Sequence, residues 1–253
     1  MVQAGWPAVG VLALSMDHAR GAMGAWVRGA AAAVLVLAAF IGGPGRAGAQ
    51  SMLDFVTFDG IDYIRWADEP GRALTLDDLG VEFAVVGCSF TEDRRGCPFG
   101  TDGAAAFMPP GSRIHAVKGH STDFRLAAEW KGKIFLYQAW RNPRAKVGAD
   151  LYDIAGKVRA IEVQRGEPTW ATPGTPVRVT FPRDTQLLVD MILRGAVGRP
   201  QAHAFGEPRY WLTLWLADGT TLGRPYFVET RELMGGILLP EDFTRILERY
   251  LPG

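Results

Sequence analysis

Three dipeptides, each placed between short apolar runs, constrain the fold more than any other feature of this sequence. They are Asp59-Gly60, Lys131-Gly132 and Asp218-Gly219. Asp-Gly favours tight connections between antiparallel strands because Gly, and to a lesser degree Asp, accepts a positive φ. We therefore expect antiparallel hairpins at all three places, with Asp218-Gly219 the strongest turn signal.

The first half of the chain reads as short strands with turns between them. Besides the first two hairpins, strands are expected over Glu82 to Phe90 and Arg113 to Lys118. Pro110-Gly111 suits a type II turn between them. Thr75 can cap one helical turn that runs through Leu79. This pattern predicts a small, curled antiparallel sheet within residues 50–142.

The second half mixes strands and helices. Strands are expected over Val158 to Gln164 and Val177 to Phe181, followed by a helix from Asp184 to about Leu193. Pro240 fits the start of a last helix. The predicted fold class is α+β, with a C-terminal antiparallel sheet that carries two helices on one face. The predicted divisions are 1–49, a β-rich subdomain 50–142, a polar link 143–156 and an α+β subdomain 157–253.

The first 49 residues have the features of a signal peptide. Arg28 precedes an apolar stretch, Ala30 to Ile41, and Ala47-Gly48-Ala49 supplies the small residues that a signal peptidase needs. About a dozen apolar residues are fewer than the roughly 20 that span a bilayer, which favours cleavage over an uncleaved anchor. We expect a secreted or extracytoplasmic protein that starts near Gln50 and has no stable membrane span. The start of translation stays open among Met1, Met16 and Met23.

Cys88 and Cys97 are the only cysteines of the chain. A polar segment with Gly96 lies between them and suits a surface loop that turns back on itself. In an oxidising compartment such a pair favours a disulfide. A metal site or a reactive thiol is the alternative, but a metal site needs more ligands than the spacing offers.

The net charge of the predicted mature chain argues against two kinds of partner, nucleic acid and anionic lipid. Its 204 residues carry 24 Lys and Arg against 26 Asp and Glu, a net charge of about −2. Such a chain has no electrostatic reason to gather on nucleic acid or on anionic lipid.

No short catalytic or cofactor motif is present. The sequence lacks G-x-S-x-G, H-E-x-x-H, the Walker loop, the Rossmann glycine fingerprint and the calcium-loop pattern. We therefore assign no catalytic residue, no metal ligand and no cofactor.

The sequence offers two weaker sources of chemistry, a histidine site and a pair of carboxylates. His115 and His120 could share a metal site with Asp123 or Asp102, although isolated histidines are the simpler interpretation. A glycosidase-like pair could come from the carboxylates of the first half, although aspartates beside turns usually accept backbone N–H groups. Those carboxylates are Asp59, Asp62, Asp77, Asp78 and Glu82.

The segment from Tyr210 to Leu216 is apolar on both faces of a strand. A central strand packed on both sides explains this pattern. The alternative is a solvent-exposed face that binds a sugar or a partner protein, because aromatic rings beside a guanidinium suit either. The residues of this candidate surface are Trp211, Trp215, Arg224 and Tyr226.

Two stretches carry a resemblance to a family. Phe107 to Ala128 (FMPPGSRIHAVKGHSTDFRLAA) with KGKIFLYQ at 131–138 resembles a module of exported proteins from Gram-positive and related bacteria. Arg209 to Phe227 with GGILLP at 235–240 resembles their C-terminal part. The biochemistry of those proteins is unassigned, so the resemblance implies export and supplies no catalytic residue.

The function that these features favour is a non-catalytic, extracytoplasmic protein that binds a partner protein or an envelope component. An extracellular hydrolase that uses carboxylates or an unrecognised metal site is the alternative. A sensory or regulatory domain tied to a transporter or kinase is a third possibility, for which the sequence itself offers no support.

Overall fold

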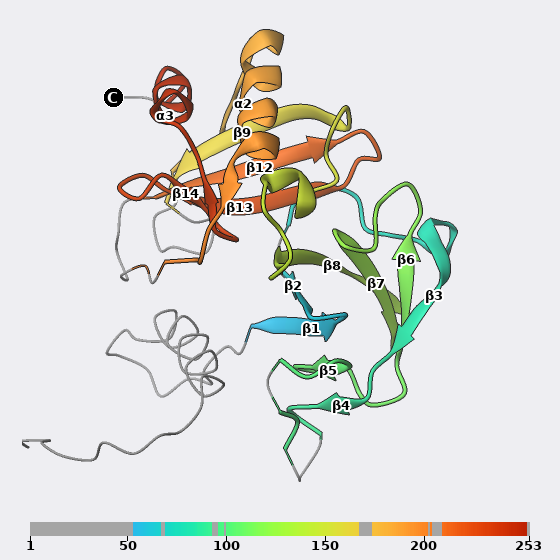
Figure 1. Ribbon diagram of the computed structural model, residues 1–253. Helices are drawn as coiled ribbons and strands as arrows, with labels where there is room; N and C mark the ends of the chain where they lie inside the picture. Colours follow the sequence, from blue (N-terminus) through green and yellow to red (C-terminus); the bar gives the residue numbers. More distant parts are fainter. Residues whose placement is uncertain are drawn as a thin grey trace, which may run out of the picture.

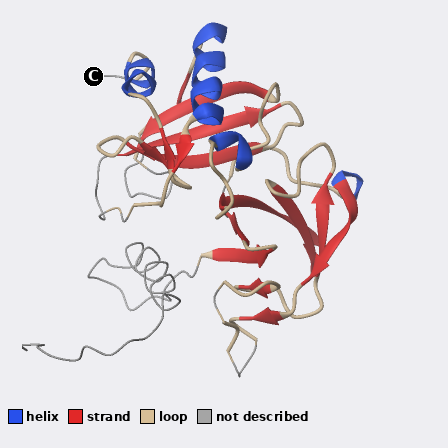
Figure 2. Ribbon diagram, viewed as in Figure 1, coloured by secondary structure: helices blue, strands red, loops and turns tan. Residues whose placement is uncertain are grey.

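The computed structural model describes residues 53–66, 69–92, 96–98, 100–166, 174–201, 203 and 209–251. The predicted signal peptide lies outside this part of the chain. Within it the protein is α+β, as predicted, with two β-sheets and the helices α2 (Pro182–Arg194) and α3 (Glu241–Glu248) (Figure 1, Figure 2).

Sheet A is a curled half-barrel of eight strands in the order β3-β6-β7-β8-β2-β1-β5-β4. Its neighbours pair antiparallel except β4 and β5, which are parallel. The strands at the two ends of this sheet, β3 and β4, follow one another in the chain with only Val86 and Gly87 between them. The single strand predicted over Glu82 to Phe90 is therefore wrong, because this segment contributes to two strands at opposite ends of the sheet. The strands are β1 (Asp54–Phe58), β2 (Ile61–Arg65), β3 (Leu79–Val85), β4 (Cys88–Ser89), β5 (Ala104–Ala105), β6 (Arg113–Val117), β7 (Arg125–Trp130) and β8 (Lys133–Arg141).

The two hairpins predicted in sheet A are present. Phe58 pairs with Ile61, and Trp130 pairs with Lys133, so each connection has two residues. Both residues of each connection have a positive φ, near 50° at the first position and near 70° at the glycine. The predicted helical turn after Thr75 is the 3₁₀ helix η1 (Leu76–Asp78).

Sheet B has seven strands, all antiparallel, in the order β10-β9-β12-β13-β14-β15-β11. Helices α2 and α3 pack on one face, where the ring of Tyr226 lies 5.0 Å from that of Phe243. The strands are β9 (Val158–Arg165), β10 (Val177–Arg178), β11 (Ala196–Val197), β12 (Arg209–Leu216), β13 (Thr221–Phe227), β14 (Glu232–Leu233) and β15 (Ile237–Leu238).

Helix α2 begins two residues earlier than predicted. Pro182 occupies its first turn, so Asp184 lies inside the helix and not at the cap. The Asp184 carboxylate instead accepts hydrogen bonds from the Tyr250 hydroxyl at 2.6 Å and from Arg249 at 3.0 Å. Asp184 therefore connects the start of α2 to the segment after α3 through these two hydrogen bonds.

One hydrophobic core includes side chains of both sheets and both helices. Leu126 of β7, Leu212 of β12 and Leu188 of α2 belong to the same buried cluster. The segment between the sheets contributes to it as well, because Tyr152 and Ile154 are buried, and it contains the 3₁₀ helix η2 (Gly148–Asp150). The strands of sheet A end at residue 141 and those of sheet B begin at 158. The division into a β-rich subdomain 50–142, a link 143–156 and an α+β subdomain 157–253 stays a prediction.

Candidate functional site

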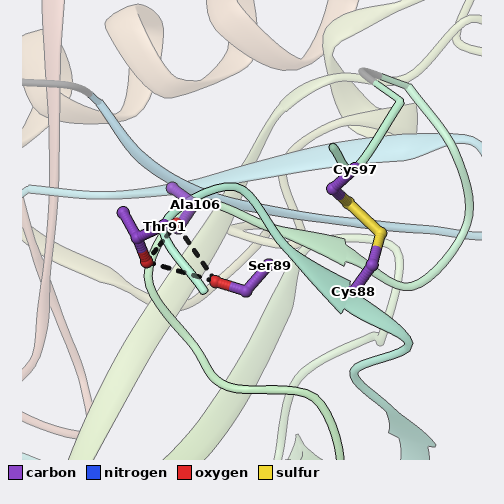
Figure 3. The surroundings of a disulfide bond; sticks show 5 residues. All are labelled: Cys88, Ser89, Thr91, Cys97 and Ala106. Carbon is purple, nitrogen blue, oxygen red and sulfur yellow. Dashed lines mark hydrogen bonds between the residues drawn. A yellow bond between two sulfur atoms is a disulfide. The ribbon is translucent and has the colours of Figure 1, made fainter. Parts of the chain in front are cut away.

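The two cysteines form a disulfide, as predicted. Cys88 of β4 is bonded to Cys97, and the Cys97 side chain is buried (Figure 3). The same loop is held to sheet A by hydroxyl groups: Ser89 Oγ and Thr91 Oγ1 both donate to the carbonyl of Ala106 (Figure 3). The disulfide therefore fixes a loop at one end of sheet A.

The predicted aromatic surface is not an open face. Trp211 is 6% exposed, and Arg224 and Tyr226 are fully buried, while Trp215 is partly exposed. Strand β12 lies between β9 and β13, and the Trp211 ring meets the Trp66 ring edge-to-face at 5.2 Å. The apolar pattern on both faces of this strand thus reflects a central position in the sheet.

The four residues also do not share a face, because the hairpin has a different register from the one that a two-residue turn would give. Leu216 N donates to Thr220 O, so three residues, Ala217 to Gly219, form the loop, and only Gly219 has a positive φ. Tyr210 is consequently opposite Tyr226. A shift by one residue moves every side chain of a strand to the other face. Arg224 and Tyr226 therefore lie on the face opposite to Trp211 and Trp215.

A buried polar cluster joins the two sheets where β7 and β8 lie beside the β12–β13 hairpin. We call it the seam cluster. Arg125 of β7 is fully buried, and its guanidinium donates to Thr220 Oγ1 at 2.6 Å and to Thr221 O at 2.7 Å. The described members of the cluster are Glu69, His120, Arg125, Gln138, Asp153, Lys157, Asp218, Thr220, Thr221 and Arg224.

A second buried guanidinium extends the seam cluster. Arg224 of β13 donates to Ala139 O at 3.0 Å and to Gln138 Oε1 at 3.2 Å. Gln138 donates in turn to Thr221 O and to Glu69. Burial raises the pKa of the Glu69 carboxyl, and the charge of Arg224 only partly offsets this. These bonds cross from sheet A to sheet B, so they fix the position of one sheet against the other.

His120 and Asp218 form the part of the seam cluster that most resembles a catalytic pair. His120 Nε2 lies 2.9 Å from Asp218 Oδ2, and the other ring nitrogen, Nδ1, lies 3.9 Å from Asp153. The imidazole is 4% exposed. Burial, followed by the charge of Arg125, lowers the pKa of His120. An imidazole this enclosed has no room for a substrate, so we interpret the pair as a structural contact between the sheets.

Asp218 carries the compensating negative charge of this region. Burial alone would raise the pKa of its carboxyl, but hydrogen bonds from Thr220 and His120 and the charge of Arg125 outweigh burial and bring the pKa to about 2. Burial lowers the pKa of Arg125 to about 10. Both groups are therefore charged at neutral pH, with Arg125 Nη1 lying 3.6 Å from Asp218 Oδ2.

The five carboxylates that could supply a catalytic pair do not come together in the structure. Four of them form ion pairs with four different arginines: Asp59 with Arg144, Asp62 with Arg141, Asp78 with Arg72 and Glu82 with Arg113. Asp77 binds Lys118 through its backbone carbonyl.

His115 and His120 do not form a metal site with Asp102 or Asp123. Asp102 accepts the N–H of Gly60, and Asp123 lines a surface cleft. Within the described ranges, no three His, Cys, Asp or Glu side chains are placed to hold a metal ion.

The surface formed by the described residues includes a polar cleft and a more apolar groove. The polar cleft of about 480 Å³ is lined by some of the residues in two segments, 121–124 and 142–153. Its Asp150 and Asp153 carboxylates accept hydrogen bonds from backbone N–H groups, and Asp153 also accepts one from Lys157. A more apolar groove of about 670 Å³ lies between η1 and the β7–β8 hairpin. We call the latter the η1 groove; its lining residues are 73–77 and 132–135.

Large apolar side chains are exposed along η1 and β3. Leu76 is 67% exposed and Val81 is 79% exposed, followed by Val85 at 47% and Phe83 at 37%. We call these four residues the edge patch. Strand β3 is at one end of sheet A, so one of its two edges has no partner strand within the described part of the chain. The sequence predicted a strand here, but nothing in its pattern indicated that the strand would lie at the end of the sheet.

The chain matches no protein-family model, no curated protein and no solved structure. In the part that the structure describes, neither helix is long and apolar enough to cross a membrane.

Proposed function

We propose that this chain is an exported, non-catalytic binding protein, and that its edge patch contacts a partner protein or an envelope component outside the cytoplasm. The disulfide fits an oxidising compartment. The apolar leader with its Ala47-Gly48-Ala49 segment supports export on sequence grounds.

The observation that carries the binding role is the concentration of apolar surface in one short segment. Eight large apolar side chains are exposed among the described residues, and four of them fall within the ten residues 76–85. An exposed apolar end strand is a ready template for another strand, and soluble proteins usually blunt such edges with charge. Here β3 carries one charged residue, Glu82. A concentration of exposed apolar side chains of this kind supports an interaction site.

The hydrolase alternative stays a prediction, and no arrangement described above favours it. The paired carboxylates of sheet A each neutralise an arginine. The enclosed His120 is engaged by Asp218.

Site-specific photo-cross-linking tests the proposal. A photoreactive amino acid replaces Val81 in one version of the exported protein and Phe181 in another, because Phe181 is 66% exposed but lies far along the chain at the start of α2. We expect a discrete cross-linked species from position 81 that is absent from position 181. Equal, diffuse cross-linking from both positions would refute the edge patch as the contact surface.

A further inference from the structure

We draw no further inference here: the strongest candidate, the η1 groove between η1 and the β7–β8 hairpin, is an apolar surface, and nothing in the described part of the chain shows what covers it.

Discussion

Replacing Asp218 by asparagine should reveal how strongly the seam cluster depends on one negative charge. Asparagine keeps the shape of the side chain and an oxygen that can accept the hydrogen bonds of Thr220. It removes the charge that faces Arg125, which is fully buried and still ionised at neutral pH. The cost therefore measures how far the buried Arg125 cation depends on the Asp218 charge, with the charges of Glu69 and Asp153 still nearby.

The magnitude follows from the structure. The pKa of Asp218 is about 2 against an ordinary value of 3.8, and this difference corresponds to about 2 kcal/mol of folding stability above pH 5. Breaking a buried ion pair by removing one partner costs about 3–5 kcal/mol. Because the Asp218 side chain is 28% exposed, we expect a loss near the lower end of that range, about 3 kcal/mol.

Urea unfolding at several pH values measures this loss. A depressed pKa gives stability that is present above the unfolded-state value and is lost as the pH falls. The wild-type contribution should accordingly shrink by about 1 kcal/mol between pH 5 and pH 3. The matched control is Glu82→Gln, which breaks an exposed pair with Arg113 and should cost less than about 1 kcal/mol. The reasoning is refuted if Asp218→Asn costs no more than Glu82→Gln, or if its cost is the same at pH 3 as at pH 7.

Two further changes probe the seam and the sheet beside it. Burial and the charge of Arg125 lower the pKa of His120, so the folded state favours the neutral imidazole. The contribution of His120 to the free energy of unfolding should therefore be fully present above pH 6.5 and decline below it. His120→Gln should flatten this decline between pH 7 and pH 5 in urea unfolding. Gly223→Ala should cost about 1–3 kcal/mol, because the new Cβ would lie 2.7 Å from the Trp211 ring. Gly87→Ala, where nothing lies nearer than 3.8 Å, should unfold at a urea concentration close to that of the wild type.

The hairpins of sheet A could be predicted because their turns are local. Asp59-Gly60 and Lys131-Gly132 each adopt positive φ at both positions, and the residues on either side set the register. The disulfide was predictable for a similar reason, since Cys88 and Cys97 are close in sequence. Contacts within about ten residues are the ones that sequence patterns encode most directly.

The β12–β13 hairpin shows that a local pattern can predict a turn without predicting the register of its strands. The dipeptide Asp218-Gly219 predicts a turn, but a two-residue and a three-residue loop are both compatible with it. The hydrogen bond from Leu216 N to Thr220 O selects the longer loop. Because of that single extra residue, Arg224 lies on the face opposite to Trp211. The residues of the predicted aromatic surface are therefore divided between the two faces of the sheet.

The seam cluster was not predictable from sequence, because its members come from distant segments. Arg125 and Thr220 are 95 residues apart, and Arg224 and Gln138 are 86 apart. An arginine in a strand is usually a solvent-exposed side chain. Its burial here depends on how sheet A lies beside β13, which no local pattern specifies.

The intact mass of the exported polypeptide, measured after thiol alkylation with and without prior reduction, tests most directly whether this is an extracytoplasmic protein. The account predicts a polypeptide that begins near Gln50, takes up no alkyl group before reduction and takes up two after it. A full-length chain that still holds Ala30–Ile41 and is alkylated at both Cys88 and Cys97 without reduction would contradict it.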